Sequence, residues 1–103
     1  MIFIESPVFT RQVIALLSDD SYAEFQHFLA MQPDAGDLIQ GTGGLRKIRW
    51  AAQGKGKRGG VRVIYFYVSA RQQMRMLLIY RKGVKDDLSA AEKKVLRGLN
   101  ETW

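Results

Sequence analysis

The chain has 103 residues, which is long enough for one hydrophobic core and too short for two domains. Its hydrophobic fraction of 47% and its net charge of +6 are those of a folded basic protein, and the lack of cysteine excludes disulfides and thiolate chemistry. No apolar run approaches the roughly 18 residues that cross a bilayer, and the opening residues lack the basic segment of a signal peptide, so we expect a cytoplasmic protein without membrane contact.

The first part of the chain predicts a strand followed by two helices. Residues 2–5 are rich in Ile and Phe and are typical of a short strand. The Ser-Pro pair at the start of residues 6–17 is typical of a helix N-terminus. A second helix is predicted over residues 18–33, because acidic residues crowd its first turn and a proline ends it. The glycine-rich residues 34–44 are expected to form a loop.

Three strands and a last helix follow. The alternation of residues 45–51 predicts a strand, and four glycines within residues 53–60 predict a hairpin turn. Residues 61–68 are β-branched and aromatic throughout, as in a central strand that is covered on both faces. Residues 74–80 predict the third strand. A Ser and a Glu in capping-box spacing start a helix over residues 88–99.

This order of elements predicts an α+β fold. We expect an antiparallel β-sheet packed against the N-terminal helix pair, with a C-terminal helix, and with the first strand paired to the three-stranded meander. The whole chain, residues 1–103, forms a single domain in this interpretation. Because the helix pair carries most of the acidic residues, we expect the sheet to be free to present the basic ones.

Charge is segregated along the chain. Residues 1–44 carry a net charge of −5, residues 45–85 carry +12 without a single acidic residue, and residues 86–103 carry −1. A segment of this kind repels itself unless an anion binds to it. A solvated basic face is the alternative, but the segregation favours an anionic partner, and nucleic acid is the leading candidate.

Several kinds of catalytic site lack the residues that they need. The only histidine, His27, is predicted on the surface of the second helix, so there is no pair of histidines for acid–base catalysis. No Cys/His group for zinc and no cluster of acids for Mg²⁺ is found in the sheet region. The glycine-rich segments do not match a phosphate-binding P-loop. We therefore expect neither a metal nor a cofactor.

What remains is a group of cations on the sheet. Lys47 and Arg49 are two residues apart on one strand and share a face, and Arg62 opens the next strand. The basic residues expected to close over the same groove from beyond the last sheet strand are Arg81, Lys82 and Lys85. Such a group binds phosphates by charge and can stabilise the phosphorane that forms when a 2′-hydroxyl attacks its own phosphate. A lysine crowded by other cations can also take part in proton transfer.

Three segments, "GTGGLRKIRWA", "GKGKRGGVRVIYFYV" and "LLIYRK", resemble the RelE superfamily of bacterial toxins, and most closely its HigB-type branch. The resemblance spans nearly the whole chain. It implies a microbial-RNase-like fold and the toxin of a type II toxin–antitoxin system. Such a toxin is a metal-independent endoribonuclease that cleaves mRNA in the ribosomal A site. The resemblance also implies a cognate antitoxin, usually a helix-turn-helix protein of the HigA type.

The resemblance implies a set of site residues. The expected catalytic residues are Lys47, Arg49, Arg62, Arg81 and Lys82. The expected contacts to RNA and the ribosome are Arg46, Lys55, Lys57, Arg58 and Lys85. In this interpretation Lys47 or Arg49 handles the proton at the 2′-oxygen, and Arg62 stabilises the phosphorane. Many relatives add a tyrosine later in the chain, whereas this sequence has none after Tyr80, which leaves more of the chemistry to the cations.

Two other functions stay open at the level of the sequence. A ParE-type relative would share the fold but would act on DNA gyrase without cutting RNA. A relative without catalytic activity would bind nucleic acid only. The full set of cations on the sheet favours the nuclease.

Overall fold

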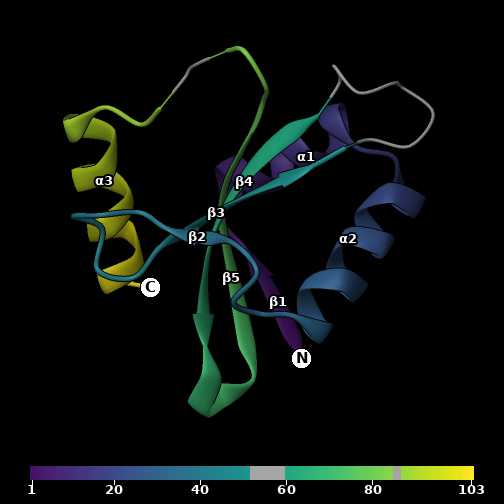
Figure 1. Ribbon diagram of the computed structural model, residues 1–103, viewed down its shortest axis with the longest axis horizontal. Coiled ribbons are helices and arrows are strands. Elements are labelled where there is room, and N and C mark those ends of the chain that lie inside the picture. The colour runs from purple at the N-terminus through teal and green to yellow at the C-terminus, as the bar shows by residue number, and fades with distance from the viewer. Residues whose placement is uncertain (52–59, 85–86) are drawn as a thin grey trace.

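The computed structural model describes residues 1–51, 60–84 and 87–103, and it confirms the α+β class (Figure 1). In chain order, the elements are β1 (Ile2–Glu5), α1 (Pro7–Leu16), α2 (Asp19–Met31), β2 (Asp37–Leu38), β3 (Arg46–Trp50), β4 (Val61–Val68), η1 (Ser69–Arg71, a 3₁₀ turn), β5 (Gln73–Arg81) and α3 (Ala90–Glu101). One prediction is wrong: the expected loop over residues 34–44 contains a short strand, β2. Apart from its last residue, the predicted hairpin turn lies outside the described residues.

The five strands form one mixed sheet in the order β1-β5-β4-β3-β2. The β2–β3, β3–β4 and β4–β5 pairs are antiparallel, but β1 runs parallel to β5. The expectation of an antiparallel sheet is thus corrected at one edge. Parallel neighbours need a crossover connection. Here the chain crosses one face of the sheet through α1 and α2 and returns through the meander, which brings β5 beside β1 in the same direction.

Helices cover both faces of the sheet. Figure 1 shows α1 and α2 on one side of the strands and α3 on the other. The core under α1 and α2 contains Phe9, Phe25 and Leu29, all fully buried. A second core on the opposite face includes Leu96 of α3 and Leu88, which lies just before this helix. The expectation that the sheet is free to present basic residues is therefore wrong for the part of this face that α3 covers.

The central strand β4 contributes to both cores. Val61, Val63 and Tyr65 belong to the core under α1 and α2, whereas Ile64 belongs to the core under α3. Ile48 and Trp50 of β3 also pack against the first of these cores. Since neighbouring residues of a strand point to opposite faces, Lys47, Arg49 and Arg62 lie on the α3 face. The sequence predicted the shared face of Lys47 and Arg49. In β5 the alternation is interrupted, because the register with β4 skips Leu77, and the adjacent Leu77 and Leu78 both belong to the core under α3.

Serine side chains start all three helices. Ser6 Oγ accepts a hydrogen bond from the backbone N–H of Phe9 at the start of α1 (3.1 Å), and Ser18 caps α2 in the same way. At α3 the predicted capping box of Ser89 and Glu92 is present in both directions. These bonds satisfy backbone donors that have no partner inside the helix.

Arg75 of β5 attaches the end of α3 to the sheet. Its Nη1 atom donates to the backbone carbonyl of Asn100 (3.2 Å) and to the side-chain Oδ1 of the same residue (3.1 Å). The guanidinium also lies 5.7 Å from the ring centres of both Phe66 and Trp103. Cation–π contacts and charge-assisted hydrogen bonds together fix the helix on this face.

Tyr65 ties β4 to the turn that precedes β2. Its hydroxyl donates to the carbonyl of Pro33 (2.9 Å) and accepts from the backbone N–H of Gly36 (2.8 Å), and burial raises the pKa of this phenol. A Cβ atom at Gly36 would lie only 2.9 Å from the Tyr65 ring and hydroxyl, so the turn packs against Tyr65 without room for a side chain. The turn and β2 are thereby held against the sheet.

We predict that Tyr65→Phe lowers the free energy of unfolding by about 1–3 kcal/mol, because it leaves the buried N–H of Gly36 and the half-buried carbonyl of Pro33 without this partner. Tyr67→Phe, on the same strand, is the matched control. The Tyr67 hydroxyl accepts only an exposed hydrogen bond from Gln72 (3.2 Å), so its loss is expected to change stability by less than about 0.5 kcal/mol. Urea unfolding followed by circular dichroism measures both, and equal losses would contradict the prediction.

Candidate functional site

Two arginines face each other across β3 and β4. Arg49 pairs with Arg62 in the strand register, and Arg62 pairs in turn with Tyr80 of β5. Residues paired in this way lie on the same face with their Cβ atoms about 5 Å apart. Lys47 lies two residues before Arg49 on the same strand and the same face. We call Lys47, Arg49 and Arg62 the basic cluster.

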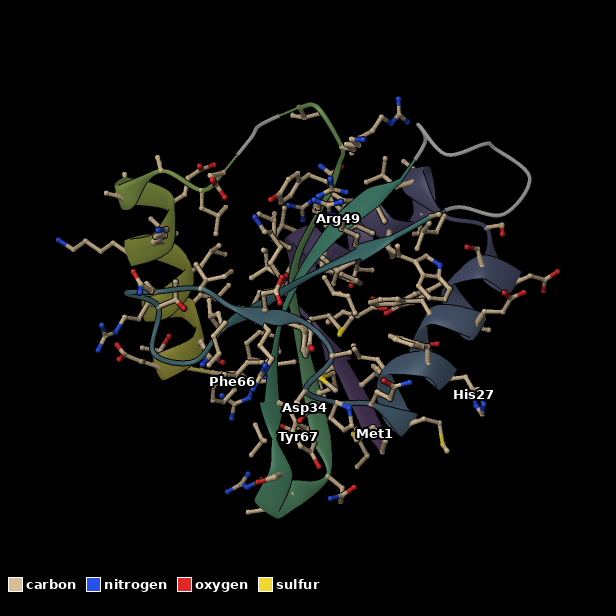
Figure 2. All side chains as sticks on the ribbon, viewed as in Figure 1. Met1, His27, Asp34, Arg49, Phe66 and Tyr67 are labelled. Carbon is tan, nitrogen blue, oxygen red and sulfur yellow. The ribbon has the colours of Figure 1, made fainter. Side chains whose placement is uncertain are left out.

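The two arginines form no ion pair with any carboxylate on the described part of the chain. Among the described residues, the Arg62 guanidinium makes one hydrogen bond, a long one to the carbonyl of Val61 (3.5 Å). Figure 2 shows the exposed Arg49 among several nitrogen-bearing side chains beside β3 and β4. Like charges placed directly opposite one another destabilise a sheet. An anion held between the guanidiniums would remove that repulsion.

Lys47 differs from the arginines, because it has a counter-charge. Its Nζ atom donates to Oδ1 of Asp87 at 3.0 Å, and this hydrogen bond holds the pKa of Asp87 below its ordinary value. The Lys47 side chain is 29% exposed and that of Asp87 is 82% exposed, so the pair lies at the surface. The acid-free stretch of sequence gave no sign of this carboxylate, which reaches Lys47 because the chain folds back after β5.

The basic cluster lines a hollow of about 560 Å³, which we call the basic hollow. Its lining residues are Phe28, Ala35, Asp37, Lys47, Ile48, Arg49, Trp50 and Arg62. Phe28 and Trp50, whose ring centres are 5.8 Å apart, give it an apolar wall. Asp37 of β2 pairs with Lys47 in the strand register and adds a carboxylate. A hollow with cations, a carboxylate and aromatic rings has the chemical features that bind a nucleotide.

The sequence prediction missed Asp37, Phe28 and Trp50 as site residues. Asp37 lies in a strand of two residues that has no detectable alternation, so its pairing with Lys47 could not be predicted. Phe28 lies on α2 next to the apolar stripe of that helix and is half-buried, so its position in the sequence did not mark it as a site residue. Only the mixture of aromatic and basic residues over β3 gave a signal that could have indicated a nucleotide-binding wall.

Arg81, at the end of β5, does not join the basic cluster as expected. Arg81 pairs with Val61, whose side chain belongs to the core under α1 and α2, so Arg81 lies on the opposite face from Arg62. It lines a separate hollow of about 340 Å³ beside the end of α1. The backbone N–H of Lys82 donates to the carbonyl of Gly60 (2.9 Å), which extends the strand pairing next to the basic cluster. Lys55, Lys57, Arg58 and Lys85 lie outside the described residues.

Arg46 lies on the face opposite the basic cluster, again in agreement with the alternation of β3. Its Nη1 atom donates to the carbonyls of Gly36 (2.7 Å) and Asp34 (3.2 Å) and so supports the turn before β2. This contact gives Arg46 a structural role beside the RNA contact that the sequence predicts. His27 lies on α2 and points away from the sheet (Figure 2), in agreement with the prediction of a surface histidine.

The described residues provide neither a metal site nor a membrane-spanning helix. Over residues 1–51, 60–84 and 87–103 there is no group of three or more His, Cys, Asp or Glu side chains that could hold a metal ion. Of the helices described above, none has the length and apolar character to cross a bilayer. No family model matches the sequence.

We predict that Asp87→Asn strengthens the binding of single-stranded RNA by about threefold, because it frees Lys47 to contact a phosphate. Glu101→Gln is the matched control, since it also raises the net charge by one and also breaks an exposed ion pair, the one with Arg97 (3.1 Å). Fluorescence anisotropy with a labelled oligoribonucleotide at fixed salt measures both affinities. If the two variants gain affinity equally, net charge alone is responsible and the local contact is not.

Proposed function

We propose that this protein is the toxin of a type II toxin–antitoxin system, with a RelE-like fold, and that it cleaves mRNA in the ribosomal A site. The observation that carries the proposal is the pairing of Arg49 with Arg62 on adjacent strands, without a carboxylate partner in the described residues. The resemblance of the three quoted segments to HigB-type toxins supports it independently. The proposal includes a cytoplasmic location, the ribosome and mRNA as partners, and a helix-turn-helix antitoxin.

The two arginines suit the chemistry of phosphodiester cleavage. When a 2′-oxygen attacks the neighbouring phosphorus, the phosphorane carries one more negative charge than the ground state. Guanidiniums hydrogen-bond phosphate oxygens in pairs and stay charged at every physiological pH. Two of them facing each other can each take a non-bridging oxygen and stabilise the added charge. The expected products are a 2′,3′-cyclic phosphate and a free 5′-hydroxyl.

The ribosome supplies what the basic hollow does not. The charged groups and aromatic rings of the hollow can bind a nucleotide, but binding alone does not bring the 2′-oxygen into line with its phosphate. Cleavage needs the 2′-oxygen, the phosphorus and the leaving oxygen in a line, and a partner that holds the mRNA in this shape contributes a large part of the rate. We therefore propose that free RNA is bound but cut slowly, and that mRNA held in the A site is the substrate.

We predict that Arg62→Ala lowers the rate of mRNA cleavage by about 100-fold or more, because it removes half of the charge stabilisation around the phosphorane. Arg97→Ala is the matched control: it removes the same side chain from the exposed surface of α3 and should leave cleavage unchanged. Primer extension on mRNA after brief induction, together with growth curves, measures cleavage and toxicity.

Each outcome of this experiment has one meaning. Discrete cuts aligned with codons in the wild type, which disappear in Arg62→Ala but persist in Arg97→Ala, support the proposal. A fully toxic Arg62→Ala variant would contradict the role of the arginine pair. Intact mRNA in the presence of trapped gyrase–DNA breaks would replace the nuclease by a ParE-type toxin, and intact mRNA without such breaks would leave nucleic-acid binding alone.

A further inference from the structure

We infer that Asp37 is the general base that removes the proton from the attacking 2′-hydroxyl. This inference rests on the proposed function and assigns to Asp37 a step that the resemblance assigned to Lys47 or Arg49. The juxtaposition that carries it is the pairing of Asp37 on β2 with Lys47 on β3, in the same basic hollow as Arg49 and Arg62.

The cations of the hollow are unsuited to accept a proton. An arginine side chain does not lose its proton in proteins, so neither Arg49 nor Arg62 can act as a base. The Lys47 ammonium donates a hydrogen bond to the carboxylate of Asp87. An ammonium group has no lone pair with which to accept a proton. A proton acceptor must therefore come from outside the basic cluster.

Only one described carboxylate lines the basic hollow. Asp37 lines both this hollow and a neighbouring one of about 380 Å³, whereas Asp87 lines only the neighbouring one, where it is bound to Lys47. Asp37 forms no ion pair with any described residue, so its oxygens are available to a ligand. Paired residues of neighbouring antiparallel strands lie on the same face, and this places the Asp37 carboxylate beside the basic cluster.

The backbone around Asp37 is held in place before any substrate binds. Gly36 donates its N–H to the Tyr65 hydroxyl and accepts a hydrogen bond at its carbonyl from Arg46. Asp37 itself is fixed by the pairing of β2 with β3. A base must be positioned within hydrogen-bond reach of the proton that it removes, and support from buried neighbours provides that precision. The Tyr65 and Arg46 contacts thereby become positioning contacts for the proposed reaction.

In the proposed step, Asp37 accepts a proton while the 2′-oxygen displaces the 5′-oxygen from phosphorus. The Asp37 carboxylate takes the proton of the 2′-hydroxyl, and the electron pair of that O–H bond forms the new bond from oxygen to phosphorus. The bond from phosphorus to the 5′-oxygen breaks and its electron pair stays on the leaving oxygen, which takes a proton from water. The acid must lie on the opposite side of the phosphorus from the base in an in-line attack, so Lys47, the neighbour of Asp37, is not the donor. Asp37 then returns its proton to solvent.

The test is single-turnover cleavage of mRNA on purified ribosomes by the full-length protein. Asp37→Asn, which keeps the shape of the side chain, is expected to lower the cleavage rate by about 100-fold or more, and Asp37→Glu to recover part of it. The Asp37→Asn variant is expected to bind ribosomes as tightly as the wild type or more tightly, when the mRNA carries a 2′-deoxynucleotide at the scissile position. This mRNA lacks the hydroxyl on which the base acts. Asp34→Asn, a loss of the same charge outside the hollow, is expected to cleave normally.

The results separate this inference from the proposed function. If the wild type cuts A-site mRNA and Asp37→Asn cuts it within about threefold of the wild-type rate, Asp37 is not the base, although the function stands. A variant that loses binding and cleavage together, or that melts at a lower temperature in proportion to its loss of rate, would assign Asp37 a structural role and overturn the inference as well. If the wild type does not cut this mRNA at all, the proposed function itself fails.

Discussion

The register of β3 and β4 constrains what this protein can bind, because it places two arginine side chains directly across from each other. The backbones of Arg49 and Arg62 cannot move apart without breaking the pairing of these strands, and β4 is buried on both faces. The sheet therefore keeps two like charges close together, and no described carboxylate forms an ion pair with either one. A phosphate oxygen on each guanidinium is the natural complement, and the proposed substrate, the hollow and the proposed base are all arranged around this pair.

The sequence was a good guide wherever the signal is local. Capping serines and prolines located the three helices, and alternation along β3 correctly assigned Lys47 and Arg49 to one face. These predictions succeed because the caps and the period of two are properties of neighbouring residues. For the same reason the sequence was sufficient to predict the class of the fold and most of the basic cluster.

The sequence was a poor guide wherever contacts join distant segments. Asp37 and Asp87 flank the acid-free stretch in sequence, yet β2 pairing and the return of the chain toward α3 bring both beside Lys47. The position of Arg81 was misjudged, because a single step along β5 moves a side chain from one face to the other. The parallel placement of β1 likewise depends on the crossover and not on any pattern within its four residues.

Under the proposed function, the arginine pair makes stability and activity oppose each other. A bound anion would stabilise the native state by mass action. Substitutions at either arginine would relieve repulsion in the sheet and would also remove the groups that are proposed to hold phosphate. The same substitutions would then raise the thermal stability of the protein and abolish its proposed toxicity. Selection for a more stable fold would therefore select against the activity. An antitoxin that places acidic groups against Arg49 and Arg62 would stabilise the fold and inhibit the proposed activity at the same time, without any change in the toxin sequence.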